Sequence, residues 1–216
     1  MKFENTSVYN IYNAILGARN PMNSWNKSDS VFNGFNGKIE NTVIGKNDLE
    51  LMHKLIKAGS EHRKFLRQIF VAVDITAPLY FFKELDTYKV GTVANSTSTM
   101  HKLANTPITI DCFEMDDFED CKDDSNVYVS AIWIESITRL EKLRQTYNAT
   151  KDKRYWKELI RLLPESWLQK RTITMNYENI LNMYRQRKNH KLTEWSKSFC
   201  NWVKTLPYAE ELICLE

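Results

Sequence analysis

Hydrophobic and polar positions change period several times along the first half of the chain. Residues 1–47 are rich in Asn, Ser and Gly and carry GFNGKI at 34–39 between short hydrophobic pieces, which predicts an arm with a hairpin. After Asn47 and Asp48, which can cap a helix, apolar residues recur at helical spacing until Gly59. An amphipathic helix is therefore predicted there, with an apolar face formed by Leu49, Met52, Leu55 and Ile56.

The next stretch, HRKFLRQIFVAVDI at 62–75, alternates along its length, with Arg67 as the exception. This pattern predicts a strand that is covered on both faces. One face would carry Phe65, Ile69, Val71 and Val73, and the other Leu66, Phe70 and Ala72. Thr76 and Pro78 then predict the start of a helix that ends near Tyr88, because a proline in the first turn loses no intrahelical hydrogen bond.

The second half of the chain begins with an acidic segment and continues in helical periodicity. Residues 111–124 carry eight acids against one lysine, which predicts an exposed loop fixed by Phe113, Met115 and Phe118. A calcium loop would need a glycine and a ligand spacing that this segment lacks. Apolar residues then recur at three- and four-residue steps, among them Ile134, Leu140 and Tyr147, and predict a helix of about five turns. Further helices are predicted at 153–163, 173–188 and 192–204.

Composition limits the class of protein. A chain of 216 residues with 43% hydrophobic and 26% charged residues is predicted to form one domain over 1–216. The formal charge of +3 argues against a general nucleic-acid binder. No stretch approaches the roughly 18 apolar residues of a membrane helix. We therefore expect a cytoplasmic protein that binds neither nucleic acid nor membrane. The cysteines lack metal-site spacing, so we expect reduced thiols and no metal at Cys112, Cys121, Cys200 and Cys214.

Motif searches leave two polar clusters as candidates for chemistry. GxGxxG, GxxxxGK[ST], HExxH and GxSxG are all absent, which removes support for the usual dinucleotide folds, P-loop enzymes, zincins and α/β-hydrolases. The first cluster is DTYKVGTVANSTSTMH at 86–101, whose hydroxyl groups can surround an anion. A Ser/Thr-rich stretch is also commonly a turn or a helix cap, and that alternative stays open. The second cluster covers 169–194.

The spacing of residues from 163 onward resembles the C-terminal half of the flavin-dependent thymidylate synthases. That family has a Leu-Pro, a Thr-x-Asn ending twelve residues after the proline, a second Asn six residues on and an Arg five beyond. The matching positions here are Leu163-Pro164, Thr174, Asn176, Asn182 and Arg187. Glu61-His62 is similar to the Glu-His with which the family begins its flavin-binding strand. The resemblance covers roughly 60–101 and 160–200, about two fifths of the chain.

The arginine-rich signature of that family, approximately RHRxxSxNExSxRY, is rewritten here. Asp86, Thr87 and Tyr88 stand in place of Arg-His-Arg, and a carboxylate repels a phosphate that a guanidinium would bind. Asn95 and Ser98 match the family's Asn and Ser, whereas Met100 and His101 replace its last arginine and its tyrosine. Substitute charge is available from Lys89, Arg63, Arg67 and Arg171.

The resemblance implies an α/β (α+β) fold with a mixed central sheet flanked by helices and a helical C-terminal half. It implies reductive methylation of dUMP to dTMP, with FAD as cofactor and with NADPH and methylenetetrahydrofolate as co-substrates. It also implies a homotetramer, and a phage-encoded version would fit the compact chain. Catalytic roles fall to Arg187, placed against the pyrimidine, and Ser98. The remaining assignments are substrate contacts at Asn95, Ser96, Thr97, Ser98, Arg171 and Arg187, and cofactor contacts at His62, Arg63, Asn176, Asn182 and His190.

Helical geometry bears on these assignments. Asn176 and Arg187 are eleven residues apart, and at about 100° per residue their directions agree to within roughly 20°, so we expect both on the face of Ile180 and Met183. Asn182 would lie on another face, which suits a helix shared between subunits. Two alternatives stay open. One is a relative that has lost catalysis and binds a nucleotide or a partner protein, and the other is an interaction module that uses Trp25, Trp195 and Trp202.

Overall fold

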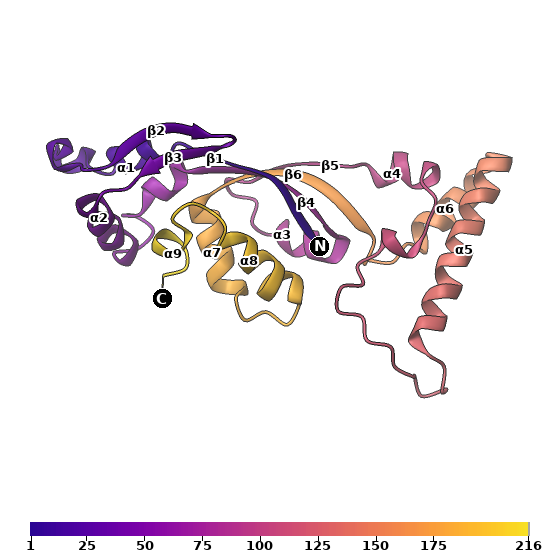
Figure 1. The fold of residues 1–216 in the computed structure, drawn as a ribbon. Coiled ribbons are helices and arrows are strands. Elements are labelled where there is room, and N and C mark those ends of the chain that lie inside the picture. The colour runs from indigo at the N-terminus through magenta and orange to yellow at the C-terminus, as the bar shows by residue number, and fades with distance from the viewer. Residues whose placement is uncertain (216) are drawn as a thin grey trace. The chain divides into compact units, whose positions relative to one another are not determined.

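The computed structural model describes residues 1–215, which divide into two compact units (Figure 1). Each unit is built from separate stretches of the chain. Unit 1 comprises Met1, Thr76–Lys83 and Ser96–Arg171. Unit 2 contains the described parts of Lys2–Ile75, Glu84–Asn95 and Thr172 onward. The single domain expected over residues 1–216 stays a prediction.

A six-stranded sheet in the order β2-β3-β1-β4-β6-β5 is the frame of the fold. β2 pairs antiparallel with β3, and β1 pairs parallel with β3, so the sheet is mixed, as expected. Gly37, with φ 61°, lies in the turn between β2 and β3 and confirms the predicted hairpin. The strands are β1 (Lys2–Tyr9), β2 (Val31–Asn36), β3 (Ile39–Val43), β4 (Phe70–Pro78), β5 (Val93–Ser96) and β6 (Leu168–Asn176).

Unit 2 holds the hairpin and the C-terminal helices. Its α-helices are α1 (Ile11–Gly17), α2 (Lys46–Lys57), α7 (Tyr177–Arg187), α8 (Cys200–Val203) and α9 (Ala209–Leu212). A π-helix, Glu194–Phe199, precedes α8, and 3-10 turns occur at Asn20–Met22, Trp25–Lys27 and Lys64–Gln68. Fully buried aromatic and aliphatic side chains form its core, among them Trp195, Tyr177, Phe199, Met52 and Leu66. The helices predicted at 47–58 and 192–204 are confirmed in outline.

Unit 1 contains the long helical hairpin of α5 (Val129–Thr150) and α6 (Lys153–Arg161). Its other helical segments are most of α3 (Leu79–Leu85), α4 (Thr99–Lys102) and the 3-10 turns Leu103–Asn105 and Ile110–Cys112. The core is made by Leu103, Ile108, Phe113, Leu140, Leu159 and Trp167. Phe113 is buried and Phe118 is half-exposed, so the acidic segment is fixed to the core mainly by its first aromatic residue.

Three predicted boundaries are wrong. Residues 64–68 form a 3-10 turn rather than the start of a strand, because a helical turn on the core buries the neighbours Phe65 and Leu66 together. Pro78 ends β4, and α3 begins only at Leu79. Residues 173–176 belong to β6, in which Ile173 and Met175 are buried in alternation with exposed threonines. Within residues 1–215, no helix has the length and apolar content that a membrane crossing requires.

Candidate functional site

The last turn of α7 presents Arg187 to three side chains of unit 2. Its Nε donates to the hydroxyl oxygen of Tyr88 at 3.0 Å, and its Nη1 lies 3.0 Å from Oε2 of Glu84. The guanidinium carbon also lies 5.2 Å from the ring centre of Trp195 and 5.7 Å from that of Tyr88, within the range of cation–π attraction. A carboxylate, a hydroxyl and two aromatic rings therefore hold this guanidinium in place.

These side chains enclose the Arg187 guanidinium only partly. The side chain is 19% exposed, and no partner of its Nη2 is found among residues 1–215. Tyr88 is itself held, because its hydroxyl donates to Oε1 of Gln186 at 2.8 Å. Nε2 of His190 lies 3.6 Å from the same Glu84 oxygen. The result is a positioned donor with a planar face, suited to a flat ring that carries a carbonyl or an anion.

A second polar cluster, which we name the Glu178 cluster, consists of Glu178, Arg63, Arg67 and Asn182. Nε of Arg63 lies 3.2 Å from Oε1 of Glu178, and Nε of Arg67 contacts the other carboxylate oxygen. Nη2 of Arg63 donates to Oδ1 of Asn182 at 3.2 Å. Glu178 is 8% exposed, and it raises the pKa of Arg67 by hydrogen bonding and charge. Because two arginines face one carboxylate, the cluster carries a net positive formal charge.

The start of α7 is fixed by an asparagine pair. Oδ1 of Asn176 accepts from the backbone N–H of Asn179, and Oδ1 of Asn179 accepts from the N–H of Asn176, which is a reciprocal cap. Nδ2 of Asn179 also donates to the backbone oxygen of Val90. Asn176 therefore precedes the helix instead of sharing a helical face with Arg187, which corrects the predicted geometry. Ile180 and Met183 are fully buried, so the face predicted around them does pack inward.

The other predicted site residues are dispersed. His62 is exposed on a turn before the 3-10 helix Lys64–Gln68, and Asn95 and Ser96 are exposed on β5. In unit 1, Thr97 pairs with the backbone of Lys170, and Ser98 caps α4 by accepting from the N–H of His101. The guanidinium of Arg171 lies 4.0 Å from the ring centre of Phe82, and its Nε donates to Gln169.

The structure brings two predicted sets together. Arg63 contacts Asn182, and Arg187 shares Glu84 with His190. The roles assigned to all of these residues stay predictions. Sequence reasoning missed the partners Glu84 and Glu178. Glu178 could have been found, because it lies one turn before Asn182 on the same face of α7.

The mixed six-stranded sheet, the helical hairpin of unit 1 and the C-terminal helices that carry Arg187 define the class: this chain has the fold of the flavin-dependent thymidylate synthases. It is similar to the crystal structure of thymidylate synthase X (ThyX) from Helicobacter pylori with FAD and dUMP. The TM-score is 0.71 at 17% identity, over 99% of this chain and 97% of that chain. A second crystal structure, flavin-dependent thymidylate synthase ThyX from Helicobacter pylori complexed with FAD and dUMP, gives a TM-score of 0.69 at 18% identity, with both chains fully covered. No protein-family model and no curated protein matches the chain.

Proposed function

We propose that this protein is a divergent relative of the flavin-dependent thymidylate synthases that binds a uridine nucleotide such as dUMP. The observation that carries the proposal is Arg187, a guanidinium fixed by Glu84 and Tyr88 with one edge left for a ligand. The fold adds support, since it extends over nearly the whole of both chains in each comparison, and both of those ThyX structures hold dUMP.

The chain's own residues would then bind and orient the nucleotide. Arg187 would donate to a pyrimidine carbonyl while Glu84 and Tyr88 keep its plane fixed, which lowers the entropy cost of binding. The sequence resemblance assigns the phosphate contacts to the short side chains of Asn95, Ser96, Thr97 and Ser98 and to the guanidinium of Arg171. Ser98 would lie beside the reacting nucleotide. The proposal includes a homotetramer, as the sequence resemblance implies.

The Glu178 cluster fits the demands of a dinucleotide cofactor. A pyrophosphate carries negative charge, and Arg63 with Arg67 offers two guanidinium groups against one carboxylate. Asn182 and the exposed His62 offer further polar groups, and His190 and Asn176 complete the proposed cofactor contacts. FAD would supply hydride chemistry there, with NADPH as reductant and methylenetetrahydrofolate as the one-carbon donor. Arg63 is held by Glu178 and Asn182, so it would meet the cofactor already oriented.

A specific observation favours a second candidate, a protein that binds the nucleotide without turnover. Asp86, Thr87 and Tyr88 stand where the family has Arg-His-Arg, and an acidic residue cannot take over a phosphate contact. Tyr88 has a different task here, because its hydroxyl and ring hold Arg187. The signature is thus lost while Arg187 is retained, which favours binding without turnover.

Absorbance of the purified protein separates the candidates. A synthase-like protein is expected to be yellow, with a flavin band at about 450 nm that shifts when dUMP is added and does not shift with deoxyuridine, which lacks the phosphate. A colourless protein that binds dUMP in a calorimetric titration would favour the second candidate. A colourless protein with no heat of dUMP binding would contradict the nucleotide site altogether.

A further inference from the structure

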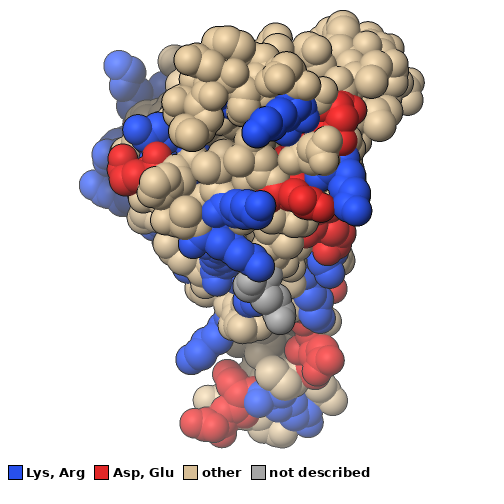
Figure 2. All heavy atoms as spheres, turned by 90° about the vertical axis from the view of Figure 1, so that its left-hand side faces the viewer, with Lys and Arg blue, Asp and Glu red and all other residues tan. Residues whose placement is uncertain are grey.

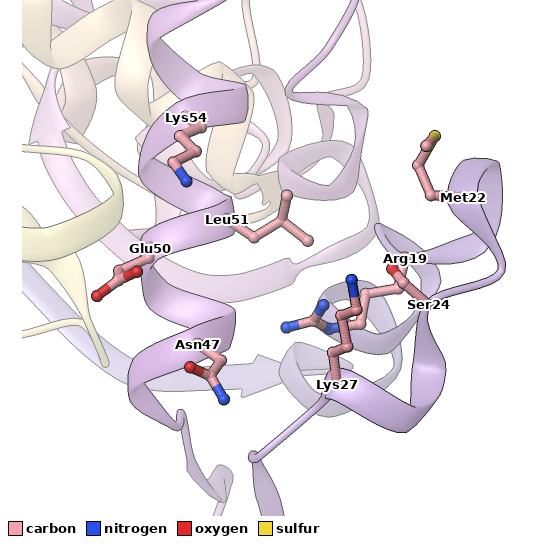
Figure 3. A pocket seen from close by; sticks show the side chains of 8 residues that line it. All are labelled: Arg19, Met22, Ser24, Lys27, Asn47, Glu50, Leu51 and Lys54. Atoms are coloured by element: carbon pink, nitrogen blue, oxygen red, sulfur yellow. The ribbon is translucent and has the colours of Figure 1, made fainter.

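Unit 2 contains a cavity of about 540 Å³ between α2 and the segment that follows α1 (Figure 3). Its walls carry the cations Arg19, Lys27 and Lys54, the polar side chains of Ser24 and Asn47, and one carboxylate, Glu50. A cavity of this volume lies in the range of small-molecule sites. None of these residues belongs to the nucleotide and cofactor positions described above.

Arg19 is the buried centre of this cavity. Its side chain is only 5% exposed, and its Nε donates to Oδ1 of Asp48 at 2.6 Å. No partner of either Nη atom is found among residues 1–215, although both belong to a side chain that lines the cavity. In Figure 3 the guanidinium lies beside Lys27 and opposite Asn47. The two Nη nitrogens are therefore available to a ligand or to solvent in the cavity.

The Asp48 carboxylate forms an ion pair with Arg19 and is itself held by several other donors. The hydroxyls of Ser28 and Ser30 donate to Oδ2 at 2.7 and 2.6 Å, and two backbone N–H groups add to them. Burial opposes ionisation of Asp48, yet hydrogen bonds from Ser30, Ser28 and Arg19 outweigh it and hold the pKa below its usual value. Asp48 therefore orients Arg19 through Nε and leaves the two Nη groups available.

Two lysines extend the positive charge of the cavity wall. Lys27 and Lys54 are exposed, and neither forms an ion pair with any carboxylate of residues 1–215. Three cations face two carboxylates, Glu50 and the Asp48 that pairs with Arg19, which leaves a formal excess of one positive charge, and Figure 3 shows the Glu50 carboxylate pointing away from the guanidinium. On the face of the molecule shown in Figure 2, lysine and arginine side chains are interspersed with acidic ones. An anion is therefore favoured by charge as well as by hydrogen-bond donors.

We propose that this cavity, which we name the Arg19 pocket, binds a phosphorylated small molecule through its pyrophosphate or terminal phosphate group. A phosphate monoester carries a charge of about −1.5 to −2 near neutral pH, which is opposite in sign to the net charge of the wall. The planar Arg19 fork suits two phosphate oxygens, and the lysines serve as point charges on the remaining ones. The pocket volume leaves room for an organic group beyond the phosphate.

The test is a calorimetric titration of the full chain with inorganic pyrophosphate, AMP and citrate at constant salt. Pyrophosphate and AMP are expected to bind more tightly than citrate, which carries carboxylates only. Lys27→Ala and Lys54→Ala are each expected to weaken pyrophosphate binding by about tenfold, since each removes one charge-assisted contact. Both lysines are exposed, so the variants should keep the melting temperature of the parent protein.

Lys57→Ala is the matched control. Lys57 is an exposed lysine of α2, one turn beyond Lys54, and it does not line the pocket. Its loss should change the affinity by less than about twofold. Tighter binding of citrate, no heat with millimolar pyrophosphate, or equal weakening by Lys57→Ala and Lys54→Ala would each overturn the proposal. Lys27→Ala and Lys54→Ala should leave dUMP binding unchanged, so failure here is distinguishable from failure of the nucleotide site.

Discussion

Two arginine–carboxylate pairs in unit 2 share the same chemistry and differ in their surroundings. Arg19 and Asp48 lie 2.6 Å apart, and their side chains are 5% and 0% exposed. Arg187 and Glu84 lie 3.0 Å apart, with 19% and 32% exposure. Asp48 is surrounded by serine hydroxyls and backbone N–H groups, whereas Glu84 shares its charge with Arg187 and His190. Burial makes the first pair important for stability, whereas the second pair is partly solvated and matters less for the fold.

The difference between the pairs follows from desolvation. A buried ion pair recovers the cost of burial only while both partners and their hydrogen bonds are present. A partly exposed pair keeps water as an alternative partner, so removing one member costs little. Removing one partner should therefore lower the free energy of unfolding much more at the Arg19–Asp48 pair than at the Arg187–Glu84 pair.

The largest expected effect is that of Asp48→Ala. It leaves the Arg19 guanidinium buried without its carboxylate and removes the acceptor of Ser28 and Ser30, so the free energy of unfolding should fall by about 3–5 kcal/mol. Urea denaturation followed by circular dichroism measures this change. The matched control is Glu84→Ala, expected to cost about 1 kcal/mol or less. Equal losses of unfolding free energy in both variants would show that burial does not make the Arg19–Asp48 pair more important for stability than the Arg187–Glu84 pair.

A third pair, Glu141 with Arg144 in unit 1, lies between these extremes. Nη2 of Arg144 lies 2.6 Å from Oε1 of Glu141, and the two side chains are 13% and 21% exposed, respectively. The hydrogen bond from Arg144 lowers the pKa of Glu141 to about 2, against the opposing effect of burial. Because the folded pKa is depressed, this stabilisation is present above the ordinary pKa of 4.5 and is lost as pH falls toward 2.

Glu141→Gln should therefore lower the free energy of unfolding by about 2 kcal/mol at pH 7, less than the full pKa shift implies because water partly solvates the pair. The deficit should shrink between pH 4.5 and 2, as the parent protein loses the same interaction. Urea titrations over that pH range measure it. Glu135→Gln on the same helix, whose pair with Arg139 is well exposed, should show almost no deficit at any pH. A deficit that is constant with pH would mean that the loss of the Glu141–Arg144 ion pair is not its cause.

The parts of the fold that the sequence predicted well are those with local signals. The hairpin at 31–43 follows from a glycine turn, and α2 and α5 follow from helical periodicity. Only residues 173–176, the end of β6, are wrongly predicted as helix, because the helical spacing of α7 is extended too far back, to residue 173. Short 3-10 turns such as Lys64–Gln68 have no comparable periodicity, and tertiary burial decides them.

The candidate site residues also divide into those with a local sequence signal and those without one. Asn182 and Arg187 were found by spacing along one helix, but Glu84 and Tyr88 lie about a hundred residues away in sequence, where no local pattern points to them. Asp48 was interpreted as a helix cap, because an acidic residue at a helix start usually is one. In the structure α2 begins after Gly45, and Asp29 accepts from the N–H groups of Asn47 and Asp48, which frees the Asp48 carboxylate for Arg19.

The smallest expected effect on stability is that of Arg187→Ala, and it should have the largest effect on dUMP affinity. The variant gives up a partly exposed ion pair and cation–π contacts, so the free energy of unfolding should change by about 1 kcal/mol or less. Calorimetric titration with dUMP should show no measurable binding. Lys188→Ala, the next residue and an exposed one, is the control and should bind as the parent does. Unaltered dUMP affinity in Arg187→Ala would mean that the guanidinium held by Glu84 and Tyr88 contributes to the fold alone. The two arginine–carboxylate pairs would then differ in stability only, and not in a role in dUMP binding.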